Sequence, residues 1–395
     1  MSEWKKCPIG EVVTLRQGFA INAKSKHYMS KEETSLPLLR IADMKNGTKE
    51  VFVKEEIPQR FIAHPEDIIY TRTGNVGLVF RNNYGVMHNN CFSVTPNDAD
   101  ELSRDFLYYA LQNKTFFDTA NALARGAAQP DLPHTSFNSI EFAYPSLFVQ
   151  ERIAYILSRY DSLIENYQKQ IKLLEEAAQR LYKEWFIDLH FPEHENTNII
   201  DGVPEGWEKK KVNSIIELQS GFAFKSSTFD DNGAYKIVTI KNVKDGAFDG
   251  DNVSKIVAIP DKMPKHCILA DGDILLSLTG NVGRVCIVNG KNYLLNQRVA
   301  KLATGFKAFT YCLFRSRDMF IEVNNLANGA AQQNVSPIRI GEMKILLPNS
   351  ELLQEFESIV FKSIARIISL QSQLRLLTEA RDRLLPKLMS GEITV

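Results

Sequence analysis

The feature that most constrains the fold is a repeat, because the second half of the chain restates the pattern of the first. The pentapeptide TGNVG occurs at residues 73–77 and again at 279–283, each time after a short apolar run. Other matches occur in the same order: Trp4 with Trp207, Gly18-Phe19-Ala20 with Gly221-Phe222-Ala223, residues 40–47 with 239–246, residues 126–129 with 329–332, and Pro145 with Pro348. Most pairs are 203 residues apart (207 − 4 and 221 − 18), which predicts a duplicated domain.

The residues after TGNVG indicate what this loop does in each repeat. A phosphate-binding P-loop needs a helix after the glycines and a Lys-Ser/Thr pair, whereas β-like residues follow both copies. We therefore expect a strand–turn–strand corner whose glycines supply unusual backbone angles, and contact of this turn with a ligand stays open. Asp67 and Asp273 precede the two apolar runs at matching positions, where capping of a turn is favoured over acid–base chemistry.

A long helical pattern follows each repeat. The first helix is expected to begin with Ser146 as its N-cap and to run to about Phe186, and the second begins with Asn349 as its N-cap. Pro386 is expected to end or kink the second helix. The apolar positions of the first helix are Ile153, Ile156, Tyr160, Leu163, Tyr167, Ile171, Leu174, Ala178, Leu181 and Trp185. Those of the second are Phe356, Val360, Ile364, Ile367, Leu370, Leu374, Leu377 and Leu384. Steps of three and four define a heptad seam.

A lone heptad helix cannot bury its seam, so the two helices are expected to pack on each other; the alternative is that each packs on its own repeat. Antiparallel pairing of about 36 residues gives a rod of roughly 54 Å, with the repeats at opposite ends. The expected fold class is α+β: two homologous globular domains with mixed or antiparallel sheets, separated by two long antiparallel coiled-coil helices, with pseudo-twofold symmetry. The expected segments are residues 1–145, a helix over 146–191, a linker over 192–203, a second globular domain over 204–348 and a helix over 349–395.

Length and composition agree with this organisation. A chain of 395 residues suggests two or three domains. It has no run of about 18 uncharged apolar residues, so no membrane span is expected, and its five cysteines lack CxxC spacing, which favours free thiols in a reducing cytosol. The net charge of zero hides an asymmetry: residues 204–348 carry +5 (19 basic, 14 acidic), whereas residues 1–145 carry −1 (16 basic, 17 acidic). The charge therefore permits nucleic-acid binding without demonstrating it.

The sequence lacks a recognisable catalytic constellation. No H-E-x-x-H, G-x-S-x-G or Walker sequence is present, and no G-x-G-x-x-G opens a helix, so no cofactor is expected. His190 and His194 flank Pro192, which disfavours a helix and makes them linker residues rather than metal ligands. Three functions are therefore weighed: a nucleic-acid reader, a duplicated protein–protein scaffold without DNA binding, and an enzyme with a site between the repeats.

The combined layout resembles a known family. Each repeat opens with a Trp and a GFA stretch, contains TGNVG and GAAQ, and precedes a long heptad helix, the first of which ends in Leu-Tyr-Lys-Glu-Trp-Phe-Ile-Asp at residues 181–188. This layout resembles the DNA-specificity subunit of type I restriction–modification systems. The resemblance implies two target-recognition domains on a helical spacer that also docks methyltransferase subunits. It further implies a non-catalytic, cytoplasmic protein whose partners are double-stranded DNA, methyltransferase subunits and a translocating endonuclease, with S-adenosylmethionine and ATP bound by those partners.

Two readers on a rigid rod would contact duplex segments about one helical turn, roughly 34 Å, apart, which predicts a bipartite target. The repeats share little over residues 81–123 and 285–326, where we expect the surface that reads different bases. Arginine and lysine suit guanine or phosphate, and Asn and Gln suit adenine. The candidate DNA-binding residues are Arg72, Asn75, Arg81, Arg125, Gln129, Asn281, Arg284, Arg298, Lys301, Gln332 and Gln333. For each of them, a solvated charge or a polar group that satisfies a turn is the alternative.

Overall fold

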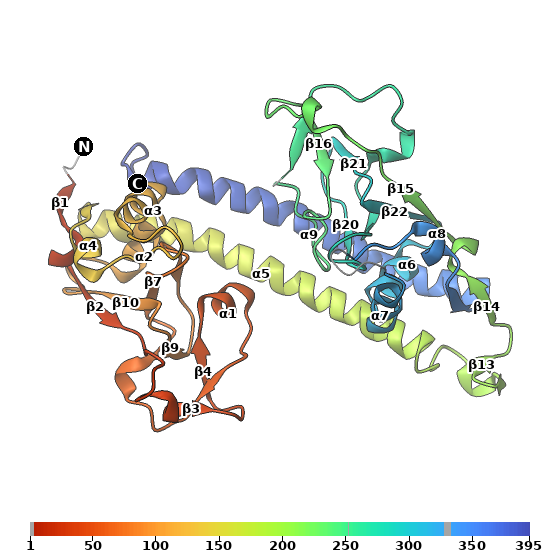
Figure 1. The fold of residues 1–395 in the computed structure, drawn as a ribbon, viewed down its shortest axis with the longest axis horizontal. Helices are drawn as coiled ribbons and strands as arrows, with labels where there is room; N and C mark the ends of the chain where they lie inside the picture. The colour runs from red at the N-terminus through yellow and green to blue at the C-terminus, as the bar shows by residue number, and fades with distance from the viewer. Residues whose placement is uncertain (1–3, 252, 328–332) are drawn as a thin grey trace. The chain divides into compact units, whose positions relative to one another are not determined.

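The computed structural model describes residues 4–251, 253–327 and 333–395. It divides into two compact units, of which unit 1 is Met1–Leu163 with Thr378–Val395 and unit 2 is Ile164–Leu377. Each unit therefore contains one globular repeat together with a segment of each long helix (Figure 1).

Repeat 1 is an α+β domain built on two sheets. An antiparallel sheet has the strand order β2-β10-β7-β8, and a second sheet has the order β3-β5-β4-β9-β6, in which β4 and β9 are parallel. The strands are β1 (Lys5–Pro8), β2 (Val13–Gln17), β3 (Met29–Ser30), β4 (Leu36–Leu39), β5 (Phe52–Val53), β6 (Ile62–Ala63), β7 (Ile68–Thr71), β8 (Val79–Phe80), β9 (Gly85–Met87), β10 (Cys91–Pro96) and β11 (Glu141–Tyr144), which pairs with β1. The helices are α1 (Ile41–Asn46), α2 (Arg104–Gln112), α3 (Lys114–Leu123) and α4 (His134–Asn138).

Repeat 2 reproduces this topology. Its sheets have the orders β15-β22-β19-β20 and β17-β16-β21-β18, and β16 and β21 are parallel. The strands are β14 (Glu208–Lys211), β15 (Ile216–Ser220), β16 (Tyr235–Val238), β17 (Ser254–Ile256), β18 (Ile268–Leu269), β19 (Ile274–Ser277), β20 (Val285–Ile287), β21 (Tyr293–Leu295), β22 (Val299–Thr304) and β23 (Lys344–Leu347), which pairs with β14. The helices are α6 (Lys307–Arg315), α7 (Arg317–Asn325) and α8 (Pro337–Gly341), and a short hairpin of β12 (Ile199–Ile200) and β13 (Val203–Pro204) precedes the repeat. The predicted duplication and fold class are confirmed.

One matched stretch adopts different local structures in the two repeats. Residues 41–46 form α1 and end at Gly47 in the left-handed conformation, whereas the matching residues 239–246 form turns with an isolated bridge between Val243 and Phe248. The helix formers Ala42 and Met44 are replaced by Lys and the β-branched Val243, which lowers helix propensity. The sequence similarity in this stretch identifies equivalent positions, but the backbone conformation at those positions differs between the repeats.

The two long helices are α5 (Leu147–Phe186) and α9 (Ser350–Met389). The Oδ1 atom of Asn349 accepts a hydrogen bond from the Leu352 amide at 2.9 Å, which confirms Asn349 as an N-cap. Of the two outcomes expected for Pro386, an end of the helix is wrong, because α9 continues to Met389 and the Ser390 amide donates to the Pro386 carbonyl at 3.0 Å. A proline in the last turn removes a single donor, which the helix end tolerates.

The helices pair with each other in both units, and their pairing is antiparallel. In unit 2, the ring of Phe356 on α9 lies 5.7 Å from Trp185 and 4.9 Å from Phe186 of α5, and Arg366 further along α9 donates to Gln170 at 3.5 Å. In unit 1, apolar residues near the start of α5 share a core cluster with the end of α9: Ile153, Ala154, Leu157, Leu388 and Met389. Each helix also packs on a globular domain, so the two arrangements expected from the sequence occur together.

The seam of α5 lies one residue away from the predicted position near its start. Leu163 is 44% exposed and Ile164 only 8%, so the packing role assigned to Leu163 is wrong and belongs to Ile164. Leu157 is likewise fully buried, whereas Ile156 is partly buried. The other predicted packing residues are buried or partly buried: Ile153, Ile171, Leu174, Leu181, Val360, Ile367, Leu374 and Leu377. A seam at 153, 157, 160, 164 and 167 keeps a strict alternation of four and three.

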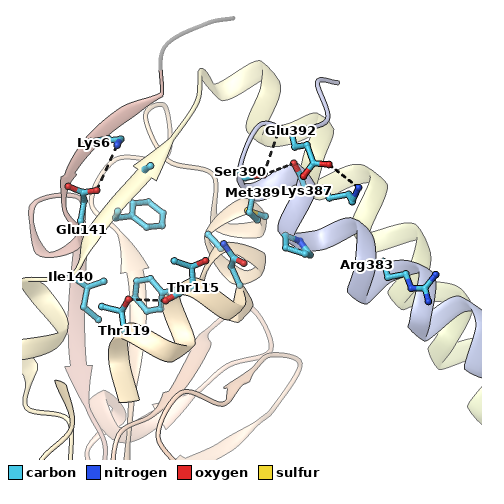
Figure 2. Close-up of a pocket in the computed structure, with 16 residues that line it drawn as sticks. Lys6, Thr115, Thr119, Ile140, Glu141, Arg383, Lys387, Met389, Ser390 and Glu392 are labelled. Atoms are coloured by element: carbon cyan, nitrogen blue, oxygen red, sulfur yellow. Dashed lines mark hydrogen bonds and ion pairs between the residues drawn. The ribbon is translucent and has the colours of Figure 1, made fainter. Parts of the chain in front are cut away.

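A hollow of about 630 Å³ lies in unit 1 between α3, the β1–β11 pair and the end of α9 (Figure 2). Its charged lining contains both signs, since Lys6 lies 3.9 Å from Glu141 and Lys387 lies 2.9 Å from Glu392. Together with Arg383, the lining carries three basic and two acidic side chains, and this net charge of +1 (3 − 2) gives little attraction for a polyanion. Among the described residues, no helix combines the length and apolar character needed to cross a membrane.

Candidate nucleic-acid interface

Four stretches that recur in both repeats meet at one corner of each domain. In repeat 1, isolated bridges join Phe19 to His88, Thr73 to Asp131 and Arg125 to Asp131. In repeat 2, the corresponding bridges join Phe222 to Asn296 and Thr279 to Asn334. The end of the first long strand, the TGNVG turn, the loop after the GAAQ stretch and the turn before β10 or β22 therefore lie together in each domain.

The TGNVG segment is the predicted strand–turn–strand corner. In repeat 1 it connects β7 to β8, with Gly74 and Gly77 at positive φ values of 83° and 93°. The hydroxyl of Thr71 donates to the Asn75 carbonyl and accepts from the Leu78 amide at 2.9 Å. Ser277 plays the same part in repeat 2, between β19 and β20. The prediction of a structural turn is confirmed.

The two carboxylates that precede these strands cap turns, as expected. Asp67 accepts the His64 amide at 2.9 Å, and Asp273 accepts the Ala270 amide at 2.8 Å.

A second turn at the corner is held rigidly in both repeats. We call residues 88–91 and 296–299 the clamped turns. Each closes through a hydrogen bond from its last amide to its first carbonyl, from Cys91 to His88 at 2.9 Å and from Val299 to Asn296 at 3.0 Å. A Cβ atom on Gly18 would lie 2.2 Å from the His88 oxygen, so the neighbouring strand approaches too closely for any residue but glycine.

The clamped turns are also bonded from both sides in the same way. The Asn89 amide donates to the Phe19 carbonyl at 2.9 Å, and the Gln297 amide to the Phe222 carbonyl at 3.0 Å. On the other side, the carbonyls of Asn90 and Arg298 accept amides from residues 72 and 278 at 2.8 and 3.0 Å. Asn89 and Asn90 are thus structurally equivalent to Gln297 and Arg298.

The corner of repeat 1 is closed by an ion pair. Arg72 donates from Nε and Nη2 to the two oxygens of Asp131 at 3.1 and 2.7 Å, and from Nη1 to Gln17 at 3.2 Å. Thr73 donates to the same carboxylate at 2.6 Å. The hydrogen bonds from Arg72, more than any other contact, lower the pKa of Asp131 below its usual range. Arg72 is consequently held by an internal partner.

The corner of repeat 2 contains a neutral pair and a hollow. Asn334 takes the place of Asp131 and accepts the Thr279 hydroxyl at 2.8 Å. A hollow of about 360 Å³ is lined by Thr279, Gln297, Arg298 and Asn334, all of them polar.

The remaining sequence-predicted candidates differ in how accessible they are. The exposed ones are Asn75, Arg125, Gln129, Asn281, Arg298 and Gln333, and Arg284 is partly buried. Gln332 lies outside the described residues. Asn75 and Asn281 occupy the tips of the TGNVG turns, and the Gln333 carbonyl accepts the Gly280 amide at 2.9 Å, so these residues gather at the same corners.

Two candidates have buried counter-ions. Arg81 stacks 4.1 Å above the Tyr108 ring and lies 3.4 Å from Asp161 of α5. The ammonium of Lys301 lies 2.9 Å from Asp273, and both side chains are largely buried. Their position favours the alternative role of charges that stabilise the fold over a role in reading DNA.

Residues 81–123 and 285–326, where the sequence predicts the surface that reads different bases, belong to the shared scaffold of each domain, and they include the clamped turns at 88–91 and 296–299. They form β9, β10, α2 and α3 in repeat 1 and β20, β21, β22, α6 and α7 in repeat 2. Phe92 and Phe106 in the first and Phe309 and Val299 in the second are at most 1% exposed. Because these segments contain core residues as well as surface residues, low similarity alone did not single out which of their residues could read bases.

The clamped turns contain three residues that sequence reasoning missed, Asn89, Asn90 and Gln297. The only signal was that HNNC and NQRV stand at the same place before β10 and β22.

Two α+β domains with one shared corner geometry and different corner side chains define a duplicated recognition protein. The family model described as the type I restriction modification DNA specificity domain matches residues 1–176 and 204–377. The chain belongs to the type I restriction–modification DNA-specificity family. The resemblance inferred from the sequence is thereby confirmed, and the family match supports DNA specificity rather than a protein-only scaffold.

Individual relatives agree with this assignment. The chain is 30% identical to the specificity subunit of the type I restriction enzyme MjaIX of Methanocaldococcus jannaschii, over 77% of this chain and 72% of that protein. It is 28% identical to the MjaVIII specificity subunit of the same organism, over 100% and 93%. The crystal structure of a type I S subunit from M. genitalium matches with a TM-score of 0.63 at 19% identity, covering 98% of this chain and 96% of that one, which shows a common fold.

Proposed function

We propose that this chain gives a type I restriction–modification complex its DNA specificity by binding a bipartite, asymmetric duplex target. In this proposal, residues 1–145 and 204–348 are the two target-recognition domains. Residues 146–191 and 349–395 are the spacer helices, and residues 192–203 are the linker. The chain directs methyltransferase and endonuclease subunits to the target and does not itself catalyse a reaction.

The observation that carries the proposal is the pair of equivalent corners. Their backbones are held by the same hydrogen bonds, whereas their side chains differ: Asn89 and Asn90 in repeat 1 correspond to Gln297 and Arg298 in repeat 2. One backbone with two sets of hydrogen-bonding side chains suits two half-sites of different sequence. The charge of +5 over residues 204–348 supports phosphate contact by the second domain.

Continuous paired helices are suited to act as a spacer. The heptad seam of α5 against α9 resists bending, so the separation of the half-sites would follow the length of the pair. S-adenosylmethionine and ATP would belong to the partner subunits, and the complex would act in the cytoplasm, where the DNA lies. The exposed corner residues Asn75, Arg125, Gln129, Asn281, Arg284, Arg298 and Gln333 remain our candidates for DNA contact.

Selection from a random duplex pool by the complex with methyltransferase subunits tests the proposal. We expect enrichment of two short motifs at a fixed separation, with affinity that falls steeply between 50 and 200 mM salt, about 10³-fold or more if six phosphates are contacted. Affinity that is independent of sequence and salt would contradict the proposal and revive the scaffold function. Turnover of DNA by the purified chain alone would contradict its non-catalytic role.

A further inference from the structure

The clamped turns carry different side chains on an equivalent backbone in the two domains. Residues common to both corners, such as the TGNVG glycines, serve what the domains share, which is the fold or contact with the uniform phosphate backbone. A residue that reads bases must instead differ between the domains while its backbone stays in place. Among the described corner residues, positions 90 and 298 meet both conditions. Their carbonyls accept equivalent hydrogen bonds, and the residue is Asn at position 90 but Arg at position 298.

Rigid support makes these positions effective readers. Each turn is closed by its own hydrogen bond, bonded to residue 19 or 222, and bonded to residue 72 or 278. Gly18 and Gly221 allow this approach, since a Cβ on either would lie 2.2 Å from a turn carbonyl. A side chain on such a support loses little backbone freedom when it binds, so more of its hydrogen-bond energy is left for discrimination.

The side chains themselves indicate which bases they suit. Arginine bonds guanine bidentately at O6 and N7, and Asn or Gln bonds adenine at N6 and N7. Gln297 and Arg298 are exposed beside the polar hollow of about 360 Å³, which leaves room for a base edge. Asn89 and Asn90 are partly buried at the equivalent turn. The backbone N–H of Asn90 donates to Nδ1 of His88 at 3.3 Å, and no described residue of repeat 1 forms a hydrogen bond with the side-chain amide group of Asn89 or Asn90.

We propose that the central residues of the clamped turns determine half-site specificity, Arg298 by reading a guanine and Asn90 by reading an adenine. Asn89 and Gln297 lie beside them on the same turns and add contacts to the neighbouring base pair. This inference rests on the proposed function, and it assigns particular bases to particular residues within it.

The test exchanges the two side chains in the full chain assembled with its methyltransferase subunits. Arg298→Asn and Asn90→Arg are compared with the unaltered complex, and the methylated motif is read from treated genomic DNA. We expect each exchange to change one base position in one half-site, with loss of about 10- to 100-fold in preference for the original base. Asn90→Arg should shift its position from adenine towards guanine.

Matched variants keep the interpretation unambiguous. Arg339 is exposed on α8 and is not among the residues that line the corner hollow, so Arg339→Asn should leave both half-sites unchanged. Arg298→Ala and Asn90→Ala remove the reading group with less steric demand, and each should relax one position to several bases.

Two results would overturn the inference. One is an unchanged motif in both exchanges. The other is an equal loss of affinity for all sequences, with the half-sites retained, which would identify phosphate contact. The unaltered complex separates this inference from the proposed function: if it selects no sequence at all, the proposed function itself fails.

Discussion

In repeat 1, Asp67 before β7 is paired with Arg16 of β2 at 2.7 Å, and in repeat 2 the matching Asp273 is paired with Lys301 of β22 at 2.9 Å. The register explains the change, because Arg16 lies opposite Ser93 and Lys301 lies opposite Gln219 in the two strand pairs. The basic residue has moved to the neighbouring strand while the carboxylate has kept its counter-ion. In both repeats the carboxylate before the strand is paired with a basic residue, and that residue comes from a different strand in each repeat.

Two other carboxylates of repeat 1 have neutral counterparts in repeat 2. Asp43 is buried and bonded by Arg40 at 2.6 and 2.9 Å, whereas Asn242 at the matching position accepts from Thr239 at 2.8 and 2.9 Å. Asp131 is similarly replaced by Asn334. Several arginines of repeat 1 are therefore held in internal ion pairs. Its number of basic residues consequently overstates its capacity to bind phosphate.

The largest expected effect on stability concerns how α5 and α9 pack in each unit. Phe356 is fully buried in an aromatic cluster with Tyr182, Trp185 and Phe186, whereas the start of α5 in unit 1 has the aliphatic Ile153. Phe356→Ala should cost about 3–5 kcal/mol of unfolding free energy, because it removes a ring and leaves a cavity. Urea unfolding of the full chain measures this cost.

The control for this variant lies on the same helix. Phe361 is 48% exposed, so Phe361→Ala should change stability by about 0.5 kcal/mol or less. Equal effects of the two variants would mean that α9 does not bury its predicted face. Ile153→Ala should cost about 2–5 kcal/mol in unit 1, and hydrogen exchange would assign each loss to its own unit.

The exchange of counter-ions between strands supports a double-mutant cycle. Lys301→Ser leaves the buried Asp273 without its partner and should cost about 3 kcal/mol. The double variant Gln219→Arg with Lys301→Ser imitates repeat 1 and should recover most of that loss, since Arg16 reaches the equivalent carboxylate from the equivalent position. A double variant as unstable as Lys301→Ser would show that the two strands are not interchangeable.

These residues also show how far the sequence alone could lead. The repeat, the TGNVG turn, the long helices and the Asn349 cap depend on local patterns and were predictable. Leu163 was misplaced because two apolar residues stand side by side at 163 and 164, and both satisfy a step of three or four. Lys301 was taken for a DNA contact because its partner Asp273 is adjacent only through strand pairing. The clamped turns are not predictable for the same reason, since Gly18 and His88 meet only in the fold.

At low pH, repeat 1 should lose stability that repeat 2 keeps, because repeat 1 contains the ion-paired carboxylates Asp43 and Asp131. Hydrogen bonds from Arg40 and Arg72 are the largest causes that lower the pKa of these two carboxyls. A lowered folded-state pKa stabilises the protein above the unfolded-state pKa, and this contribution is lost as pH falls through the folded-state pKa. Below about pH 4 repeat 1 should therefore lose stability that repeat 2, with Asn242 and Asn334, does not lose by this route.

Hydrogen exchange over the equivalent strands β4 and β16, followed at pH 3 and at pH 6, measures this difference. Asp43→Asn should lower stability at pH 6 by about 1–2 kcal/mol and flatten the acid dependence of repeat 1. If both domains lose protection in parallel, the carboxylates of other ion pairs govern acid unfolding, and the contrast between the repeats has no energetic consequence.

The smallest expected effect tests the corrected seam. Leu163→Lys places a charge on a side chain that is already 44% exposed and should change stability by about 0.5 kcal/mol or less. Ile164→Lys is the matched variant, and because Ile164 is 8% exposed it should cost several times more through burial of a charge. Thermal unfolding of the two variants compares them directly. If Leu163→Lys lowers stability more than Ile164→Lys does, the helices pack along the face that the sequence first suggested. The residues at 157, 160 and 164 would then not form the packed seam.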